Sequence, residues 1–543
     1  MANMAPMPNN REIAAKLEEF AVLLDLAGAN SYGVRAYRRA AELIRTTPAP
    51  VADLVHAGRV RELRGIGPGI ETRLRELVAT GRIAELEELE RSVSPALVGL
   101  GRFLGIGSRR MLTLAQALGV RTPEEFETAA RGGRIADAPG FGPKTQEKVL
   151  AALESRADGP RARPLLLPRA RGLLLDIAEA LDGEIAGDAR RWRDACEDLA
   201  VVCATGAPER AIEAFANLPQ IVAMVERGTD GAVGVTVEGT PVTLVVAQPE
   251  NAGTALTRAT GTERYVAALG RLPEAPDEPG VYGALGVPLC PPELREEPFR
   301  GEPPRLLELA DMRGDLHAHS MWSDGKATVL EMGLAARGRG YEYLAICDHT
   351  PNVRVVPGVN ADDLRRQAEE IAAANEELAP FRILRGVECD ILVDGSLDLP
   401  DDVLAELDWV TASLHAGQRT PHPEITERVA EAMKHPAVRA LSHPTGRLIN
   451  HRPENALDLD EMFGVALETG TALEVNGLPD RLDLKGEHVR RALAAGVAIV
   501  VNTDAHSTTG LGNMELAVRT ARRGWATAAD VVNTRPLAEL LRP

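Results

Sequence analysis

The last two fifths of the chain concentrate histidine and carboxylate side chains that could bind metal ions. Six of the 11 histidines fall in five short strings, DLHAHS, CDHT, SLHAG, SHPTG and TDAH. His317 and His319 are separated by one residue, so on a strand they point to the same side and can bind one metal together. Asp504 and His506 repeat this spacing, and Asp324 follows the first pair closely.

Glu388, in the string RGVECD, offers two carboxylate oxygens that could bridge neighbouring ions. A single histidine is more often a hydrogen-bonded structural residue than a ligand. Nine such groups are harder to explain in that way, because clustered carboxylates would repel one another without bound cations. The predicted metal ligands are His317, His319, Asp324, His349, Glu388, His415, His443, Asp504 and His506, of which Glu388, Asp504 and His506 are the predicted catalytic residues.

Apolar strand-like runs precede most of these ligands. Residues 344–346, 409–411 and 498–501 are examples, and helical stretches separate them. This alternation predicts a parallel barrel or an open α/β sheet. In a barrel, the ligands would converge at the carboxyl ends of the strands, where such folds place their chemistry.

These motifs resemble the PHP (polymerase and histidinol phosphatase) domain across residues 311–543. The resemblance implies a distorted TIM-like (β/α) barrel with about three metal ions, and the nine ligands match all nine ligand positions of the family. It also implies that Glu388 bridges two ions and that the domain hydrolyses phosphate esters. The family uses manganese, zinc or iron; we expect Mn²⁺ or Zn²⁺.

Three arginines near these ligands could bind the substrate phosphate. Arg447 and Arg452 lie in HPTGRLINHR, and guanidinium groups bind phosphate oxygens in pairs. Asn476 and Arg481, in NGLPDRLDL, resemble another family segment that lines the pocket. Arginines on a barrel rim are equally common without such a role, so both readings stay open.

Three segments near the N-terminus place a Gly-x-Gly turn before a helix: LRGIGPGIETRLREL, LGIGSRRMLTLAQAL and APGFGPKTQEKVLAAL. They resemble the helix-hairpin-helix motif. Glycine permits a tight turn, and the helix N-terminus that follows offers amide groups to a phosphate. The predicted DNA-backbone contacts are Gly65, Gly67, Gly105, Gly107, Arg109, Gly140, Gly142 and Lys144, with Arg110 adding charge. Such binding would be salt-sensitive and independent of sequence; the alternative is a set of plain helix-helix turns.

Bulk properties limit the remaining possibilities. A chain of 543 residues needs several domains, and its net charge of −18 argues against DNA binding by bulk attraction. Five cysteines without paired short spacings favour reduced thiols. The beginning, MANMAPMPNN, lacks a basic segment followed by an apolar run, and no stretch has membrane-spanning length. We expect a cytoplasmic protein with no membrane partner.

The order of segments resembles the bacterial family X DNA polymerases over nearly the whole chain, including the strings SYGVRAYRRAAELI and YGALGVPLCPPELRE. This resemblance implies an N-terminal helical, lyase-like domain at 1–80 and a fingers-like domain at 81–160. It further implies a small α/β palm-like nucleotidyltransferase domain at 161–271, a thumb remnant or linker at 272–310, and the PHP domain at 311–543. The Pro-, Gly- and Glu-rich stretch 272–304 is predicted to be a linker.

The carboxylates that this family uses for nucleotidyl transfer are not all present. Aligning the family's palm motif with AGDARRWRDACEDLAVV matches one carboxylate to Asp198, whereas the second position is Ala200 and the third is Thr243. Asp188 stands where the family has a serine beside the triphosphate. A shifted alignment could bring in Asp194 or Glu197, but it would supply no acid near Thr243. Loss of metal ligands removes transition-state stabilisation, so polymerase activity is predicted to be absent.

The sequence therefore predicts a DNA-repair phosphoesterase, a 3′–5′ exonuclease or 3′-end processing enzyme with possible abasic-site activity, acting on gapped, nicked or damaged DNA. Two alternatives stay open: an active template-directed polymerase of family X, and a small-molecule phosphatase of the histidinol phosphatase type.

Overall fold

The computed structural model describes residues 8–26, 31–47, 49–63, 65–92, 94–154, 164–354 and 356–541. Residues 1–7, on which part of the expectation about a leader segment rests, lie outside these ranges, as does the predicted boundary near residue 160. The chain divides into two compact units. The first comprises residues 1–163, 177–183 and 205–247, and the second comprises residues 164–176, 184–204 and 248–543.

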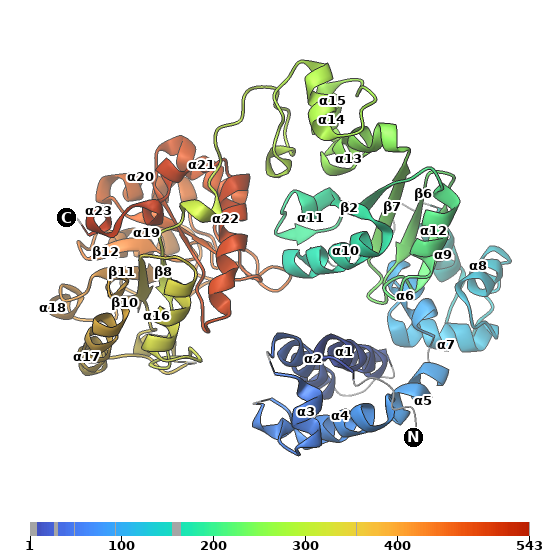
Figure 1. Ribbon diagram of the computed structural model, residues 1–543, viewed down its shortest axis with the longest axis horizontal. Coiled ribbons are helices and arrows are strands. Elements are labelled where there is room, and N and C mark those ends of the chain that lie inside the picture. Colours follow the sequence, from blue (N-terminus) through green and yellow to red (C-terminus); the bar gives the residue numbers. More distant parts are fainter. Residues whose placement is uncertain are drawn as a thin grey trace. The chain divides into compact units, whose positions relative to one another are not determined.

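The first unit is mainly helical at its N-terminal side. Glycine and proline mark where its helices begin: Gly67 and Gly107 are the N-caps of α4 and α7, and Pro68 follows Gly67 at the first helical position. The helices are α1 (Asn10–Leu26), α2 (Ser31–Thr46), α3 (Val51–His56), α4 (Pro68–Thr80), α5 (Ala84–Ser92), α6 (Pro95–Phe103), α7 (Ser108–Leu118), α8 (Pro123–Arg131) and α9 (Pro143–Glu154) (Figure 1).

The same unit ends in an antiparallel sheet with one helix, α12 (Pro208–Ala216). Strand β6 (Gly231–Val235) pairs with both β5 (Ala223–Arg227) and β7 (Pro241–Ala247). Buried and partly buried side chains alternate along β7, as expected for a strand with one face on a core.

The second unit begins with the short elements β1 (Leu165–Leu166), β2 (Gly183–Ala186), α11 (Gly187–Arg190), β3 (Ala195–Cys196) and β4 (Leu199–Ala204). Helix α10 (Leu167–Leu181) follows β1 and continues into residues of the first unit. β1 and β3 are antiparallel, with Leu165 opposite Cys196.

The prediction of a linker at 272–304 is wrong. Helices α13 (Ala252–Thr260), α14 (Glu263–Leu269) and α15 (Glu278–Leu285) form a small bundle with a core that includes Tyr265, Tyr282 and Leu294. The proline and glycine residues that suggested a linker instead delimit α15, because Pro279 lies in its first turn and Gly286 ends it in the left-handed conformation.

Residues 314–541 form a parallel barrel of seven strands in chain order. The strands are β8 (Gly314–Ala318), β9 (Tyr343–Ile346), β10 (Arg382–Asp390), β11 (Trp409–Ser413), β12 (Val438–Leu441), β13 (Ala472–Asn476) and β14 (Ile499–Asn502). A bridge between Ala318 and Ala505 nearly closes the ring between β8 and β14. This arrangement confirms the predicted TIM-like fold, including the strands at 344–346, 409–411 and 498–501.

Helices surround these strands, which explains why most strand residues are buried on both faces (Figure 1). They are α16 (Val329–Gly338), α17 (Ala361–Leu378), α18 (Asp401–Leu404), α19 (Glu424–Met433), α20 (Leu459–Thr469), α21 (Gly486–Ala495), α22 (Met514–Arg523) and α23 (Leu537–Leu540). In the described part of the chain, none of the helices has the length and apolar character needed to cross a membrane.

Candidate metal centre

The nine predicted ligands come together at the carboxyl ends of the barrel strands. His317 lies in β8 with His319 just beyond it, and Glu388 lies near the end of β10. The other six ligands occupy the connections that follow strands: Asp324 after β8, His349 after β9, His415 after β11, His443 after β12, and Asp504 and His506 after β14. The parallel register thus brings residues almost 190 positions apart into one site.

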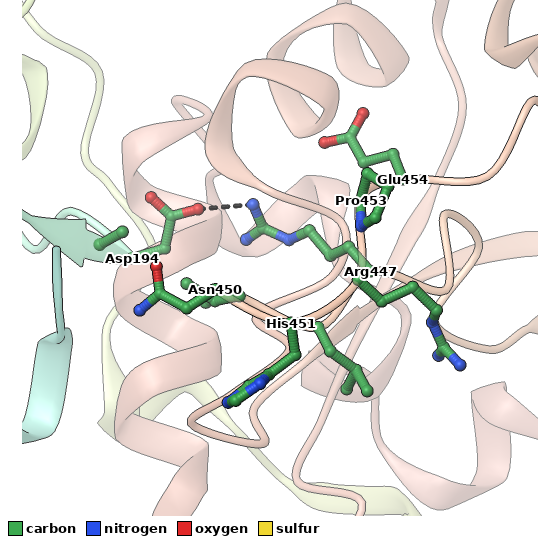
Figure 2. Close-up of a pocket in the computed structure, with 10 residues that line it drawn as sticks. Asp194, Arg447, Asn450, His451, Pro453 and Glu454 are labelled. Atoms are coloured by element: carbon green, nitrogen blue, oxygen red, sulfur yellow. Dashed lines mark ion pairs between the residues drawn. The ribbon is translucent and has the colours of Figure 1, made fainter. Parts of the chain in front are cut away.

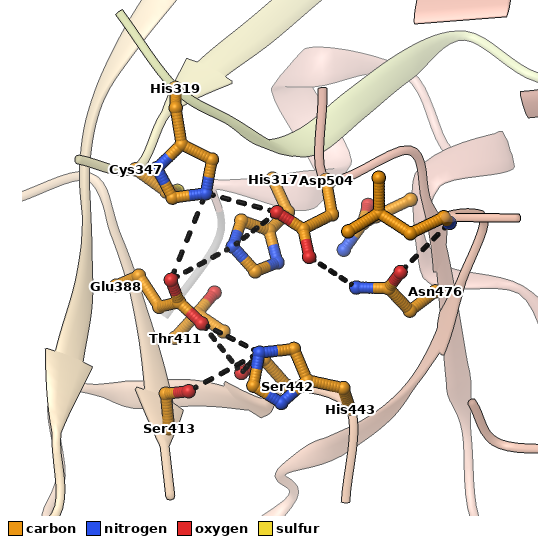
Figure 3. Close-up of polar contacts among 12 residues, drawn as sticks. His317, His319, Cys347, Glu388, Thr411, Ser413, Ser442, His443, Asn476 and Asp504 are labelled. Carbon is orange, nitrogen blue, oxygen red and sulfur yellow. Dashed lines mark hydrogen bonds and ion pairs between the residues drawn. The ribbon is translucent and has the colours of Figure 1, made fainter. Parts of the chain in front are cut away.

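Glu388 lies at the centre of this group, 1% exposed, with imidazoles facing both of its oxygens (Figure 3). Its Oε2 lies 2.7 Å from His349 Nδ1, 3.5 Å from His317 Nε2 and 3.7 Å from His319 Nε2. Its Oε1 lies 2.9 Å from His443 Nε2 and 3.4 Å from His415 Nε2. A carboxylate with two sets of nitrogen donors on its two oxygens is placed as a bridging ligand would be.

Asp504 and Asp324 supply two further carboxylates beside His319, facing its Nε2 and its Nδ1 respectively. Asp504 Oδ1 lies 3.1 Å from His319 Nε2 and 3.8 Å from His317 Nε2. Asp324 lies 3.3 Å from His506 Nε2 and 3.6 Å from His349 Nε2. These acids and imidazoles form a continuous set with the ligands around Glu388.

In the part of the chain that the structure describes, three groups of side chains are close enough to hold a metal ion, each with its ligand atoms within 4.8 Å of one another. They are His319, Asp324, His349 and His506; His317, His319 and Asp504; and His349, Glu388 and His415. His319 and His349 belong to two groups each, so neighbouring ions would share ligands.

The buried nitrogen atoms fit a cationic group. Among the described residues, His317 Nε2, His319 Nδ1 and His443 Nδ1 are buried without a hydrogen-bond partner, and His349 Nδ1 and Glu388 Oε2 face each other at 2.7 Å without hydrogen-bond geometry. A buried polar atom left unpaired costs about 1–3 kcal/mol, and several together would be costly in an ordinary core. Metal ligation would satisfy these atoms.

The ionisation of two of these residues, His319 and Glu388, also suits ligation. Burial, with the neighbouring His349 and His506, lowers the pKa of His319 to about 4, so its imidazole is neutral at physiological pH. Burial alone would raise the pKa of Glu388, but His415, His349 and His317 outweigh it and hold this pKa well below its usual range. Neutral imidazole and ionised carboxylate are the forms that bind metals.

Two ligands adopt backbone conformations that non-glycine residues rarely use. The φ angles of His443 and Asp504 are 24° and 54°. Such conformations typically cost about 1–3 kcal/mol each and concentrate at functional sites. The backbone amide of His443 is held by a hydrogen bond of 2.8 Å to Glu474 Oε2.

Two residues that the sequence reading missed orient the ligands. Glu474 Oε1 accepts a hydrogen bond of 2.7 Å from His317 Nδ1, and Asp390 Oδ1 lies 2.6 Å from His415 Nδ1. Carboxylates behind metal-bound imidazoles fix the ring and raise its basicity. A sequence signal exists, since Glu474 is an acid inside the apolar strand ALEVN and Asp390 lies two residues after Glu388.

The three predicted phosphate-binding arginines differ in their surroundings. Arg481 has no side-chain ion pair among the described residues, and its charge, after burial, lowers the pKa of His443. Arg452 donates from Nε to Gly446 O at 2.7 Å. Arg447 is 9% exposed and each of its three guanidinium nitrogens already has a partner. Phosphate binding stays a prediction for all three, and the contacts favour Arg481. Asn476 donates to Asp504 Oδ2 at 2.9 Å.

The three hairpin turns share one backbone conformation. Their first glycines, Gly65, Gly105 and Gly140, have φ angles of 113°, 68° and 81°, which favour glycine. The second glycine directly precedes α4, α7 or α9, and a Cβ there would meet open space. Arg109 and Lys144, beside the second and third turns, are exposed. The geometry leaves the helix N-termini accessible to a phosphate backbone.

The palm-like segment lacks the expected cluster of carboxylates. Ala200 lies on β4 and Thr243 on β7. Asp188 is buried and accepts hydrogen bonds from the backbone amides of Glu197 and Asp198 at 2.8 and 2.9 Å, besides its ion pair with Arg191. Burial and the charge of Asp188 raise the pKa of Asp198. The charge of Asp188 is thus neutralised by a cation of the same segment.

Known proteins match both ends of the chain. A helix-hairpin-helix domain model matches residues 8–83, and a SAM-like helix-hairpin-helix tandem model matches residues 99–155. The probable phosphatase of Acetivibrio thermocellus is 32% identical over 37% of this chain and 82% of its own length. A probable phosphatase of Photobacterium profundum is 29% identical over 37% of this chain and 81% of its own length. These phosphatases match the C-terminal part.

One relative matches from end to end. The DNA polymerase/3'-5' exonuclease PolX of Bacillus subtilis is 35% identical over 98% of this chain and 98% of its own length. Together with the hairpin arm and the C-terminal barrel, this similarity means that the chain belongs to the PolX family, the family X DNA polymerases that carry a PHP domain.

Proposed function

We propose that the chain is a metal-dependent phosphoesterase that removes nucleotides from the 3′ ends of DNA, and that its polymerase site is inactive. The observation that carries the proposal is the convergence of nine imidazole and carboxylate groups at the barrel mouth: eight fall in groups that could hold a metal, and the ninth, His443, lies 2.9 Å from Glu388. The similarity to a DNA polymerase/3'-5' exonuclease supports DNA as the substrate.

The proposed ligands are the nine residues named above, for about three ions of Mn²⁺ or Zn²⁺. Bound divalent cations would lower the pKa of a shared water and neutralise the phosphate oxygens and the leaving alkoxide. The protein holds the ligands ready for them, since Glu474 orients His317 and Asp390 orients His415. Arg481 is the proposed contact to a non-bridging phosphate oxygen, because its guanidinium is free of described ion pairs and close enough to influence His443.

The helical arm is the proposed DNA-binding part. Three Gly-x-Gly turns with accessible helix N-termini offer backbone amides to phosphates, and Arg109 and Lys144 add charge beside two of them. Such contacts position a duplex without reading its sequence. We propose gapped, nicked or damaged DNA as the ligand, with abasic DNA included among the substrates.

Loss of polymerase activity is proposed from the palm-like segment. Of the three positions where the family has carboxylates, two are Ala200 and Thr243 here. A bound triphosphate would need positive charge near Asp188, but the acid Asp188 stands there and already pairs with Arg191. Asp194, the candidate from a shifted alignment, pairs with Arg447 instead of pointing at a nucleotide site. Two-metal nucleotidyl transfer needs carboxylates that this segment does not supply.

A small-molecule phosphatase is the second candidate function. The net charge of −18 favours a small substrate over a long polyanion, and the probable phosphatases match the C-terminal part. To separate the two, gapped, nicked and abasic DNA and histidinol phosphate are incubated with the protein, in Mn²⁺ and in Zn²⁺ separately. Release of terminal nucleotides from DNA supports the proposal, whereas phosphate release from histidinol phosphate alone refutes it.

A further inference from the structure

The degenerate palm-like segment keeps one acid whose partner belongs to the barrel. Asp194 Oδ2 lies 2.6 Å from Arg447 Nη1, and the two side chains are 14% and 10% exposed (Figure 2). Arg523 Nη1 lies 3.5 Å from Asp194 Oδ1. Burial alone would raise the pKa of Asp194, but Arg447 and Arg523 lower it to about 2, so the carboxylate is charged at physiological pH.

The ion pair fixes a guanidinium that joins two segments of the barrel. Arg447 Nε donates to Arg481 O at 2.8 Å, and its Nη2 donates to Leu482 O at 2.5 Å. Leu482 has a φ of 44°, a conformation that needs support from its surroundings in a non-glycine residue. With Nη1 on Asp194, all three nitrogens of the fork are used, which fixes the orientation of the guanidinium.

Both segments continue into the metal centre. The segment that contains Arg447 begins with the ligand His443, and Thr445 N donates to Asp483 Oδ1 at 3.3 Å. The main chain of Asp483 accepts a hydrogen bond of 2.7 Å from Asn476 N. Asn476 in turn donates to the ligand Asp504 at 2.9 Å. Displacement of Arg447 would therefore affect residues on both sides of the centre.

The connection lies beside an open pocket. Asp194, Ala195 and residues 447–454 line a cavity of about 450 Å³ (Figure 2). Within the described residues, two polar contacts join the 447–454 loop to the palm-like segment here: the Asp194–Arg447 ion pair and a hydrogen bond of 2.8 Å from Asn450 Nδ2 to Pro164 O. The barrel also holds this loop, because Ile449 N donates to Asp480 O at 2.7 Å and Glu454 pairs with Lys485, so the two contacts add to those within the barrel.

We propose that Asp194 is a positioning residue of the phosphoesterase centre: the palm-like segment, though unsuited to nucleotidyl transfer, orients Arg447 and through it the segments that carry His443 and Arg481. The inference rests on the proposed phosphoesterase function. Under this inference, the palm-like segment contributes the carboxylate of Asp194 to the phosphoesterase domain.

The test compares Asp194→Asn with Asp188→Asn in the full-length protein loaded with Mn²⁺. Both changes neutralise a buried, ion-paired acid of the same segment, but Asp188 pairs with Arg191 and has no described contact with residues 443–454 or 481–484. The substrates are thymidine 5′-(p-nitrophenyl phosphate), which reports the centre without the arm, and a 5′-labelled primed DNA. Metal content and thermal unfolding are measured for each variant.

Asp194→Asn is expected to lower kcat about tenfold on both substrates, with unchanged metal content, whereas Asp188→Asn stays within about twofold of the unmodified protein. Arg447→Lys, which keeps the charge opposite Asp194 but cannot hold both carbonyls, is expected to lower kcat similarly and serves if Asp194→Asn does not fold. Three outcomes would overturn the inference: an unchanged kcat in folded Asp194→Asn, a fall in its kcat on the DNA substrate alone, or an equal fall in kcat in Asp188→Asn. Inactivity of the unmodified protein on both substrates would instead refute the proposed function.

Discussion

The barrel mouth and the palm-like segment are two regions where a family X polymerase with a PHP domain would be expected to bind metal ions, and they differ in what their polar atoms do. At the barrel mouth, imidazole nitrogens and an oxygen of Glu388 are buried without hydrogen-bond partners. In the palm-like segment, Asp188 has a cation and two amides, and Arg190 pairs with Glu278. The unpaired atoms at the barrel mouth include imidazole nitrogens, which can bind a metal, whereas Arg191 Nε, which is unpaired in the palm-like segment, cannot.

The largest expected effect tests whether the barrel mouth alone carries hydrolysis. His317→Ala removes a ligand that faces both Glu388 and Asp504, and hydrolysis of primed DNA should fall by about three orders of magnitude or more. DNA affinity, measured by fluorescence anisotropy, should change little. His435→Ala, a histidine of the same domain outside the centre, is the control; substantial activity in His317→Ala would contradict the site assignment.

The second effect concerns pH and metal binding. Burial alone would lower the pKa of His506, but Asp324 and Asp504 raise it to about 9 in the metal-free protein. Below this pH a bound metal must displace the proton, so apparent Mn²⁺ affinity should rise at least about tenfold per pH unit between about pH 7 and 9. Calorimetry in buffers of different ionisation enthalpy measures the released protons. Affinity that is flat across this range would show that His506 is not a ligand.

The third effect concerns the carboxylate behind His317. Glu474→Gln keeps the shape of the side chain but weakens its hold on His317 Nδ1 and on the amide of His443, so metal affinity or kcat should fall by about 10- to 100-fold. The exposed Glu468→Gln on α20 serves as control. A change under threefold would indicate that the ligands are held without Glu474.

A smaller effect should appear in the helical arm. Arg109→Glu combined with Lys144→Glu should weaken binding of primed DNA about tenfold and reduce its salt dependence, because two phosphate contacts are lost. Hydrolysis of thymidine 5′-(p-nitrophenyl phosphate) should not change. If DNA affinity stayed the same, the hairpins would be plain helix-helix turns.

The smallest effect is expected in the palm-like segment. Asp198→Asn alters the one aligned palm carboxylate, and nuclease activity should stay within about twofold because Asp198 has no described contact with the metal centre. Nuclease and primer-extension assays are run in parallel. If the unmodified protein extended the primer and Asp198→Asn did not, the palm-like segment would be an active polymerase site. The contrast between the two regions would then be wrong.

The sequence predicted which nine imidazole and carboxylate groups come together, because short His and Asp spacings and preceding apolar runs are local features and a parallel barrel gathers strand ends at one mouth. It could not predict which nitrogen of each imidazole would have a partner, because such partners are distant in sequence. Glu474, which pairs with His317 Nδ1, is 157 positions away from it. The environment of Arg447 could not be predicted either, because its partner Asp194 lies in another segment. Composition misled at 272–304, where prolines that begin helices resemble linker residues.

A single reaction tests the central claim most directly: 5′-labelled primer annealed to a longer template, incubated with Mn²⁺ and all four deoxynucleoside triphosphates. The account predicts that the labelled strand becomes shorter from its 3′ end and never longer than the starting primer, and that His317→Ala leaves it unchanged. Template-directed lengthening in either protein, or no shortening by the unmodified protein in Mn²⁺ or in Zn²⁺, would contradict it.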